Sequence, residues 1–452
     1  MKKTTLLFVT AIFCSTFTFA QWAKMDLTLS GGGTISNAVN QLALDNGKLY
    51  AATADGIFES ATANGADWTP FGLQGKRVFM MSFATQKFAL TAETAADDAT
   101  KKTLQLYKLN GANWELTNFN PTKLAVFGTA LDNLINFAQI NDGTNNVVVV
   151  PTWGNGIWRS TDGGANWTKS DYAACPDAAE NALSYKKVPG IYSFPGDATL
   201  YGTDKPSGGS NGYQSNIQYV IYSEDFGATW KNLPVANFFN PWAFHKRKVG
   251  GETFFYWGGK DGNQGAIWRS GDAGLNWDAS LTSGVEYWDN RRIIGEDDGP
   301  LYIMCSVNNV YVSTDNGDSF LLVGAGIVIP ETKPAPAGEP FFLTNLIKSS
   351  SKLYLSTYND GIYQFALAAN ALKNTKINNL EIYLNQDQSE LAVNAEIGSQ
   401  ISIYSITGKL LKSVFSDNIT SKMSINELSS SVYIVKAVTT DGTHSINRFI
   451  KK

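Results

Sequence analysis

The chain has 452 residues, of which 43% are apolar, 12% aromatic and 17% charged, and its formal net charge at pH 7 is −4. This length exceeds that of one ordinary domain and allows a sizeable core. The slightly acidic balance argues against nucleic acid as a partner, and the presence of only two histidines limits the available acid–base and metal chemistry.

Residues 1–20 have the pattern of an export signal peptide. Two lysines precede an apolar run from Leu6 to Phe13, and Ala20 provides the small residue expected before cleavage. A large residue precedes Cys14 where a lipoprotein needs a small one, so a plain signal peptide is favoured over lipidation. After cleavage no apolar run is long enough to span a membrane. We therefore expect a protein that is secreted or held at the outer-membrane surface.

One turn sequence recurs along the chain, most completely as RSTDGGANW at Arg159 to Trp167. In this copy Asp162 can accept hydrogen bonds from its own turn, Gly164 can adopt a positive φ, and Trp167 is a large apolar anchor. Looser copies end at Trp68 and Trp114 and lack the aspartate. The structural residues expected in the four clear copies are Asp162, Gly164, Trp167, Asp225, Gly227, Trp230, Asp272, Gly274, Trp277, Asp315, Gly317 and Phe320.

These copies resemble the Asp-box (BNR) repeat, Ser-x-Asp-x-Gly-x-x-Trp, of sialidases, xyloglucanase-type glycosidases, sortilin-like receptors and photosystem assembly factors. The resemblance implies a β-propeller in which the turns serve the scaffold and not catalysis. Repeats of this length bury a core only when they stack on one another.

A second pattern counts the repeats, because an aliphatic–aromatic pair precedes each turn. Successive aromatic residues of these pairs are 43 to 64 residues apart, which suits four short strands per unit. The pairs are Ile57-Phe58, Leu106-Tyr107, Ile157-Trp158, Ile221-Tyr222, Ile267-Trp268, Val310-Tyr311 and Ile362-Tyr363. We therefore predict an all-β chain with a seven-bladed β-propeller over residues 21–370.

The last unit has no tryptophan after its pair, which leaves its outer strand missing. The segment QWAKMD after the signal peptide is similar to NWTKSD at Asn166–Asp171. We expect the N-terminal segment to pair with the last blade and close the ring, which removes exposed strand edges.

The sequence pattern changes after residue 370, where the predicted propeller ends. Residues 371–379 form a polar linker, and residues 380–452 contain short alternating strands without tryptophan, which predict a small immunoglobulin-like β-sandwich. Leu428, Val432, Tyr433, Ile434 and Lys436 resemble the core of the type A C-terminal sorting domain of the type IX secretion system of Bacteroidetes.

This resemblance implies that the secretion machinery is a partner and that the protein crosses the outer membrane and is then released or attached to the surface. Two positions depart from the family pattern, because Ser431 replaces the usual glycine and Ile382–Gln386 replaces the usual Tyr-Pro-Asn-Pro. An accessory β-sandwich without an export role is the alternative.

The ligand face is expected opposite the repeated turns, where loops join the second strand to the third and one blade to the next. Aromatic residues beside polar groups can stack on sugar rings or anchor a protein, although blade packing is the alternative for each of them. The expected ligand-binding residues are Trp153, Trp242, Trp257, Trp288, Tyr358, Arg291 and Arg292, with Tyr213, Phe238, Phe239, Tyr287, His245 and Asp261 nearby in sequence.

Binding of a glycan or protein is the favoured function, and hydrolysis of an extracellular polysaccharide is the alternative. A glycoside hydrolase needs two carboxylates about 5 to 10 Å apart. The candidates are Asp289, Asp261 and Glu286, followed by Asp177 and Glu180. Enzymes of the xyloglucanase type usually form their cleft from two propellers, whereas this sequence predicts one. The few arginines argue against a sialidase.

No cofactor or metal is expected. The acidic loop Glu296–Asp298 does not match a complete calcium loop and is interpreted as a solvated turn. Cys175 and Cys305, which remain after signal cleavage, are interpreted as thiols and not as a disulfide, because they are expected to lie far apart.

Overall fold

A computed structural model describes most of the chain after residue 20. The described ranges are 21–62, 67–95, 98–120, 124–125, 135–152, 155–171, 188–204, 219–233, 242–261, 264–278, 290–305, 309–324, 343–367, 378–405, 410–438 and 444–452. The chain divides into two compact units, Met1–Ala368 and Ala369–Lys452. The described residues form strands and turns and no helix, so the protein is all-β.

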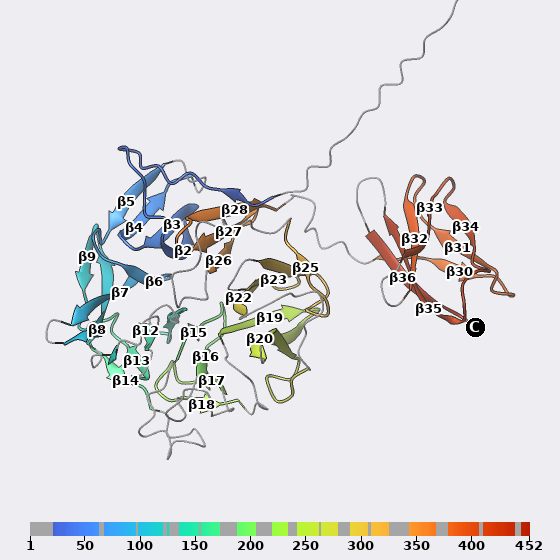
Figure 1. The fold of residues 1–452 in the computed structure, drawn as a ribbon. Helices are drawn as coiled ribbons and strands as arrows, with labels where there is room; N and C mark the ends of the chain where they lie inside the picture. The colour runs from blue at the N-terminus through green and yellow to red at the C-terminus, as the bar shows by residue number, and fades with distance from the viewer. Residues whose placement is uncertain are drawn as a thin grey trace, which may run out of the picture. The chain divides into compact units, whose positions relative to one another are not determined.

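Within the described residues the first unit contains seven antiparallel sheets that follow one another around a ring (Figure 1). The first three are β2 (Val39–Asp45), β3 (Lys48–Thr53), β4 (Gly56–Ser60) and β5 (Trp68–Gly72); β6 (Val78–Phe83), β7 (Lys87–Ala95), β8 (Asp98–Asn110), β9 (Asn113–Leu116) and β10 (Leu124–Ala125); and β11 (Ala138–Asn141), β12 (Asn146–Pro151), β13 (Ile157–Ser160) and β14 (Thr168–Lys169).

The remaining sheets continue in chain order. They are β15 (Ile191–Tyr192), β16 (Leu200–Asp204), β17 (Tyr219–Ser223) and β18 (Lys231–Asn232); β19 (Ala243–Val249), β20 (Glu252–Asp261) and β21 (Gln264–Ser270); β22 (Asn290–Gly295), β23 (Leu301–Cys305), β24 (Val310–Ser313) and β25 (Leu321–Leu322); and β26 (Leu343–Lys348), β27 (Lys352–Thr357) and β28 (Ile362–Ala366) with β1 (Ala23–Lys24).

The second strand of each sheet is covered on both faces, and its sequence reflects this. In β12 the four valines from Val147 to Val150 are 0% exposed. A continuous β-branched run fits a strand that packs against neighbours on both sides. The seven aliphatic–aromatic pairs of the sequence analysis each lie in the third strand of a different sheet.

The N-terminal segment closes the ring, as the sequence predicts. Ala23 and Lys24 of β1 pair with Gln364 and Tyr363 of β28 and supply the outer strand of the last sheet. Trp22 adds a second contact, because its indole Nε1 donates to the carbonyl oxygen of Val323 at 3.1 Å.

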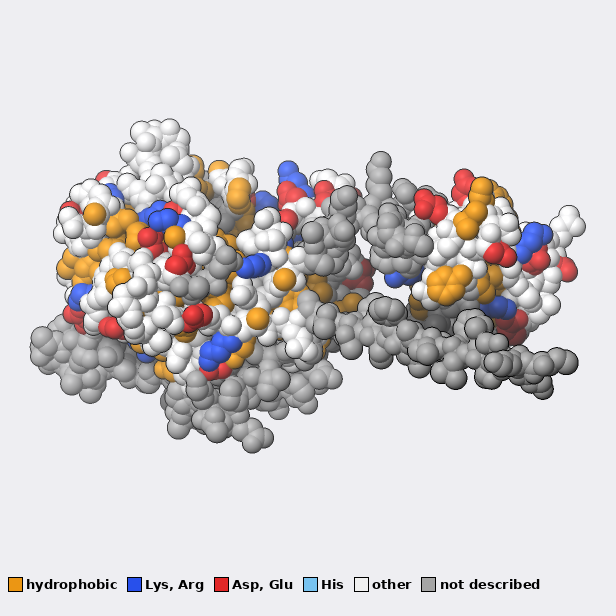
Figure 2. Space-filling view, turned by 90° about the horizontal axis from the view of Figure 1, so that it is seen from above, with side chains coloured by type: hydrophobic (Ala, Val, Ile, Leu, Met, Phe, Trp, Pro, Cys, Tyr) orange, Lys and Arg blue, Asp and Glu red, His pale blue; other side chains and the backbone are white. Residues whose placement is uncertain are grey.

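The second unit is a β-sandwich of two sheets. One contains β29 (Asn378–Asn379), β36 (His444–Lys451), β35 (Ser431–Val438), β32 (Gln400–Ser405) and β33 (Leu410–Phe415), and the other contains β30 (Ile382–Leu384), β31 (Glu390–Asn394) and β34 (Thr420–Ser424). Leu391 and Val393 of the smaller sheet share a core with Ile401 and Val435 of the larger one. Figure 2 shows apolar side chains at the surface of this unit, and Phe415 is the most exposed of the large ones, at 72%.

Candidate functional site

The four repeated turns, which we call the Asp turns, comprise residues 160–167, 223–230, 270–277 and 313–320, and they share one hydrogen-bond pattern. In the first, Asp162 Oδ1 accepts from the Ser160 hydroxyl and from the backbone N–H of Asn166, both at 2.8 Å. The Ser160 hydroxyl oxygen in turn accepts from the Gly164 N–H at 2.8 Å. The same bonds recur around Asp225, Asp272 and Asp315, so each aspartate holds its own turn closed.

Hydrogen bonds within the turns lower the pKa of three of these carboxylates, those of Asp162, Asp225 and Asp272. For Asp162 and Asp225 burial raises the pKa, but hydrogen bonds from within the turn outweigh it and leave the pKa below its ordinary value. For Asp272 the backbone and side chain of Asn276 lower the pKa to about 2. Carboxylates held ionised by their own turn are poor proton donors, which fits a structural role.

The glycines of these turns pack against the preceding sheet. Gly227 has φ +83°, and a Cβ atom there would lie 2.9 Å from Cγ2 of the fully buried Val149. Gly274 has φ +87°, and its Cβ would lie 3.0 Å from Cδ1 of Leu233. Both positions therefore require glycine for the backbone and for the close approach.

Two arginines, Arg159 and Arg269, each link one Asp turn to the next. The Arg159 guanidinium donates to the carbonyl oxygen of Phe226 at 2.8 Å, and that of Arg269 donates to the carbonyl oxygen of Asn316 at 2.9 Å. Each accepting residue is the non-glycine residue with positive φ in the Asp turn of the following sheet. We call the face of the ring that carries these turns and arginines the Asp-turn face.

A second repeated turn, which the sequence analysis missed, lies at the opposite face. The hydroxyl groups of Thr53, Thr152 and Thr357 each donate to the carbonyl oxygen of a glycine three or four residues later, at 2.8 to 2.9 Å. Each hydroxyl oxygen also accepts a backbone N–H two or three residues later. The threonine at the end of the second strand and the following glycine are the signal that identifies these turns in the sequence.

Most residues of the predicted ligand face lie outside the described residues. This applies to Trp153, Trp288, Asp289 and Glu286. Asp261 and Arg291 lie on strands β20 and β22, but their side chains lie outside the description as well.

The two described tryptophans of the predicted ligand face are placed differently from the expectation. Trp257 is 0% exposed and packs against Trp268 and Trp277, with ring centroids 5.1 and 6.3 Å away. Trp242 is 4% exposed. Blade packing, the alternative left open in the sequence analysis, therefore describes both buried indoles. For Trp257 the reason is that it lies in β20, a second strand.

Tyr358 and Arg292 each contact a residue from another sheet or loop of the ring. The guanidinium of Arg77 lies 5.6 Å from the ring centroid of the half-buried Tyr358. Arg292 reaches the carbonyl oxygen of Ile135 at 2.6 Å. Burial lowers the pKa of Arg292 to about 10, and the nearby Tyr192 opposes this shift.

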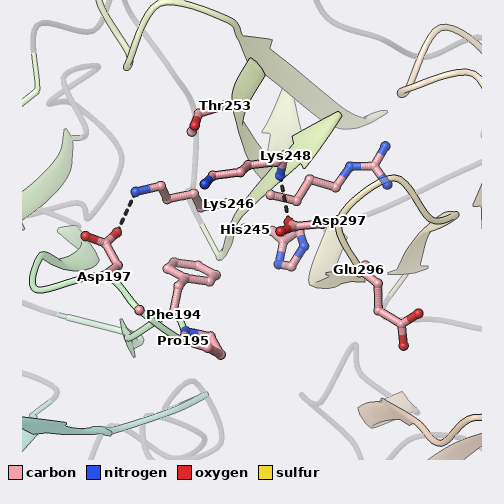
Figure 3. A pocket seen from close by; sticks show the side chains of 12 residues that line it. Phe194, Pro195, Asp197, His245, Lys246, Lys248, Thr253, Glu296 and Asp297 are labelled. Atoms are coloured by element: carbon pink, nitrogen blue, oxygen red, sulfur yellow. Dashed lines mark hydrogen bonds and ion pairs between the residues drawn. The ribbon is translucent and has the colours of Figure 1, made fainter. Parts of the chain in front are cut away.

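A pocket of about 610 Å³ opens on the Asp-turn face, away from the predicted ligand face. Three consecutive sheets build it, because its walls come from the β15–β16 loop, the β19–β20 hairpin and the end of β22 (Figure 3). Loops between first and second strands lie at the same end of an antiparallel sheet as loops between third and fourth strands. The lining residues are Phe194, Pro195, Gly196, Asp197, His245, Lys246, Arg247, Lys248, Thr253, Gly295, Glu296 and Asp297.

Charged residues of the pocket are tied to the scaffold by ion pairs and hydrogen bonds. Lys246 Nζ lies 2.5 Å from Asp197 Oδ2, and the two side chains are 22% and 17% exposed. Arg247 is 4% exposed, and its guanidinium donates to the carbonyl oxygen of Gly299 and to Oδ1 of Asn316 in an Asp turn, at 2.5 and 3.1 Å. The charged side chains that line the pocket are therefore fixed by contacts within the protein.

The acidic loop Glu296–Asp298 also belongs to this region, and it forms a structural turn. Oδ1 of Asp297 accepts the backbone N–H of Lys248 at 2.8 Å, and Oδ1 of Asp298 accepts that of Gly250 at 2.7 Å. The loop thus caps the free edge of β19. In the part of the chain that the structure describes, no three His, Cys, Asp or Glu side chains gather to hold a metal ion.

Two further points concern the cysteines and membrane-spanning segments. Cys305 is a buried thiol in β23, and Cys175 lies outside the described residues. Across the described ranges no helix is long and apolar enough to cross a membrane.

Comparison with known proteins relates the chain to propeller proteins. No protein-family model matches. The chain is 24% identical over 356 residues to a xyloglucanase of Hypocrea jecorina (strain QM6a), which covers 69% of this chain and 41% of the relative. The chain thus spans less than half the length of the curated relative that it matches.

Among solved structures, the fold is similar to that of the GH74 xyloglucanase from Xanthomonas campestris, with a TM-score of 0.50, 15% identity, and coverage of 95% of this chain and 74% of that one. It is also similar to virginiamycin B lyase from Staphylococcus aureus, with a TM-score of 0.50, 14% identity, and coverage of 77% and 99%. The ring of sheets together with these likenesses shows that the first unit is a β-propeller.

Proposed function

We propose that this chain is an extracellular, seven-bladed β-propeller that binds a polysaccharide. The observation that carries the proposal is the 356-residue alignment with a xyloglucanase, a protein whose name states action on a polysaccharide. The alignment favours a glycan over a protein as the ligand. The seven sheets of the described residues, with four matching Asp turns, support the assignment of seven blades and of Asp boxes.

Binding is tested with soluble xyloglucan as the probe. The chain from Gln21 to Lys452 is run through native gels with and without the polysaccharide, and retardation is compared with that of a protein of similar size. We expect selective retardation by the polysaccharide. Equal mobility in gels containing xyloglucan, other β-glucans or no polysaccharide would overturn the proposal.

Hydrolysis of a polysaccharide is the second candidate, favoured by the names of the aligned relative and of the similar GH74 structure. The residues proposed for it are Asp289, Asp261 and Glu286. The test measures reducing ends released from xyloglucan by the wild type, by Asp289→Asn and by the control Asp45→Asn on the Asp-turn face. Release that Asp289→Asn abolishes and Asp45→Asn preserves would support an enzyme, whereas retardation without release would support a binding protein.

The C-terminal β-sandwich is proposed to be an immunoglobulin-like sorting domain for type IX secretion. Tyr433, one of the matching residues, stacks on Phe449 with ring centroids 5.3 Å apart. Lys451 Nζ donates to the carbonyl oxygens of Ile425 and Leu428 at 2.6 and 2.7 Å, which ties the basic terminus to the loop before β35. Two of the matching residues, Tyr433 and Leu428, thus belong to one packed core.

Export is tested in a Bacteroidetes host that has this secretion system. Deletion of residues 371–452 should leave the propeller in the periplasm, and fusion of residues 371–452 to a periplasmic reporter should carry the reporter out of the cell. N-terminal sequencing of the secreted protein should begin at Gln21. Normal secretion of the truncated chain would contradict the export role.

A further inference from the structure

We propose that the pocket on the Asp-turn face binds one neutral sugar residue of the polysaccharide. This inference rests on the proposed function and deepens it, because it identifies the binding site and the chemistry of its ligand. The site lies on the face opposite to the one that the sequence indicates.

The size and walls of the pocket suit a sugar ring. A volume of about 610 Å³ lies within the range of small-molecule sites, roughly 300 to 1,000 Å³. Phe194 and Pro195 form an apolar wall at one side, and the polar side chains of β19 and β20 face them across the pocket (Figure 3). The Phe194 ring is fixed by edge contacts with Tyr201 and Phe244, with ring centroids 6.0 and 6.1 Å away. A rigid apolar wall opposite polar groups matches the two kinds of surface on a sugar.

The pocket is lined by charges of both signs, and Glu296 is also paired with Lys348 outside the lining, which favours a ligand with hydroxyl groups over a simple ion. Its lining contains three cations, Lys246, Arg247 and Lys248, and three carboxylates, Asp197, Glu296 and Asp297. Burial lowers the pKa of Lys246, but the hydrogen bond and charge of Asp197 outweigh it, so the pKa of Lys246 is above its ordinary value. Ammonium and carboxylate groups held side by side donate to and accept from neighbouring hydroxyls of one sugar.

A buried histidine supplies an independent sign of a missing partner. The Nε2 atom of His245 is shielded from solvent and, within the described residues, makes no well-aligned hydrogen bond, although the backbone of Gly295 lies close enough to raise the pKa of the imidazole. Buried polar atoms are normally paired, and an exception at the wall of a pocket points to a ligand group. The position beside it is a glycine: a Cβ atom on Gly295 would lie 3.3 Å from His245 Nε2. The backbone of Gly295 therefore packs closely against the imidazole of His245.

Two substitutions and one control test the site. Lys246→Ala removes one pole of the ion pair. Gly295→Ala removes no polar group and places a methyl group 3.3 Å from His245 Nε2 and 3.2 Å from the carbonyl oxygen of Pro300. The control is Lys87→Ala, because Lys87 also forms an ion pair between adjacent sheets, with Asp45, and also lies over an aromatic ring, that of Phe83. Tryptophan fluorescence and circular dichroism establish that each variant is folded.

The assays are saturation-transfer NMR with xylose, glucose and galactose as probes, and xyloglucan affinity from gel retardation. We expect transfer to at least one sugar in the wild type, and a loss of about tenfold or more in affinity in both pocket variants, equivalent to about 1.4 kcal/mol. The control should bind as the wild type.

The two proposals fail in different ways. If the wild type binds xyloglucan and both folded pocket variants bind equally well, the pocket is not the site and the proposed function stands. If the wild type binds neither xyloglucan nor any of the sugars, the proposed function is overturned and the pocket assignment with it.

Discussion

Replacing Gly227 by alanine tests whether the Asp turns hold neighbouring sheets together. Gly227 has φ +83°, and the new Cβ would lie 2.9 and 3.3 Å from the two methyl groups of Val149 in the preceding sheet. The control is Gly111→Ala in the β8–β9 hairpin, where φ is +61° and no atom lies within 4 Å of the new Cβ. The two variants share the backbone strain and differ in the contact between sheets.

The expected loss in the free energy of unfolding differs between the two variants. A left-handed conformation costs an alanine about 1–2 kcal/mol, so Gly111→Ala should lower the free energy of unfolding by about that amount. Overpacking of a buried contact adds about 1–3 kcal/mol at Gly227. The total at Gly227 is about 2–5 kcal/mol. The effect of alanine on the unfolded chain is similar at both positions and leaves the difference unchanged.

Tryptophan fluorescence during urea unfolding reports this difference for the propeller alone, because all 12 tryptophans precede residue 369. The slope of the transition should match between variants, so that the midpoints measure stability. Equal destabilisation by Gly227→Ala and Gly111→Ala would refute the role of the turn glycine in packing the sheets.

Three further predictions concern the pairing of the N-terminal segment with the last sheet, the Asp turn at Asp225, and stability in acid. Trp22→Ala should destabilise the propeller by about 2 kcal/mol, roughly half the effect of a fully buried indole, because it removes the ring contact with Phe365 at 5.4 Å; an unchanged urea midpoint would contradict ring closure by this segment. Asp225→Asn should cost about 1–2 kcal/mol at pH 7, because an amide offers one acceptor oxygen where the carboxylate uses both; the variant should also lose less stability than the wild type as pH falls below about 4, since the folded pKa of Asp225 is depressed. Burial, followed by the charge of Arg247, lowers the pKa of His245 from 6.5 to about 4, so protonation of the unfolded chain should remove about 3 kcal/mol of stability as pH falls from 6.5 to 4. His245→Gln should flatten unfolding stability in that window, and identical pH profiles would refute this assignment.

The sequence predicts those parts of the fold that depend on local interactions. The Asp turns are predictable to the level of single hydrogen bonds, because the serine, aspartate and glycine that form them lie within a few residues of each other. The closure by β1 is predictable because Trp22 and its neighbours repeat the pattern of another outer strand.

The pocket is not predictable in the same way, because its residues come from three sheets separated in sequence. The sequence carries one local signal, because the run from His245 to Lys248 places four consecutive basic residues in a first strand, whereas the first strand β6 is mainly apolar. The burial of Trp257 was also foreseeable, since the run TFFYW is a continuous apolar second strand like that at Val147–Val150. Exposure of an aromatic residue depends on which strand of the sheet carries it, and single positions do not reveal this.

The seam formed by β1 and β28 has a consequence for the timing of folding. Lys24 Nζ and Asp360 Oδ1 are joined at 2.5 Å although 336 residues separate them. Contacts of such sequence separation form slowly, because a long loop must be closed before they gain any stability. The ring therefore cannot be completed until almost the whole propeller has been synthesised. A chain whose last sheet has not yet formed remains open, and Ala23 and Lys24 complete the ring when they pair with β28.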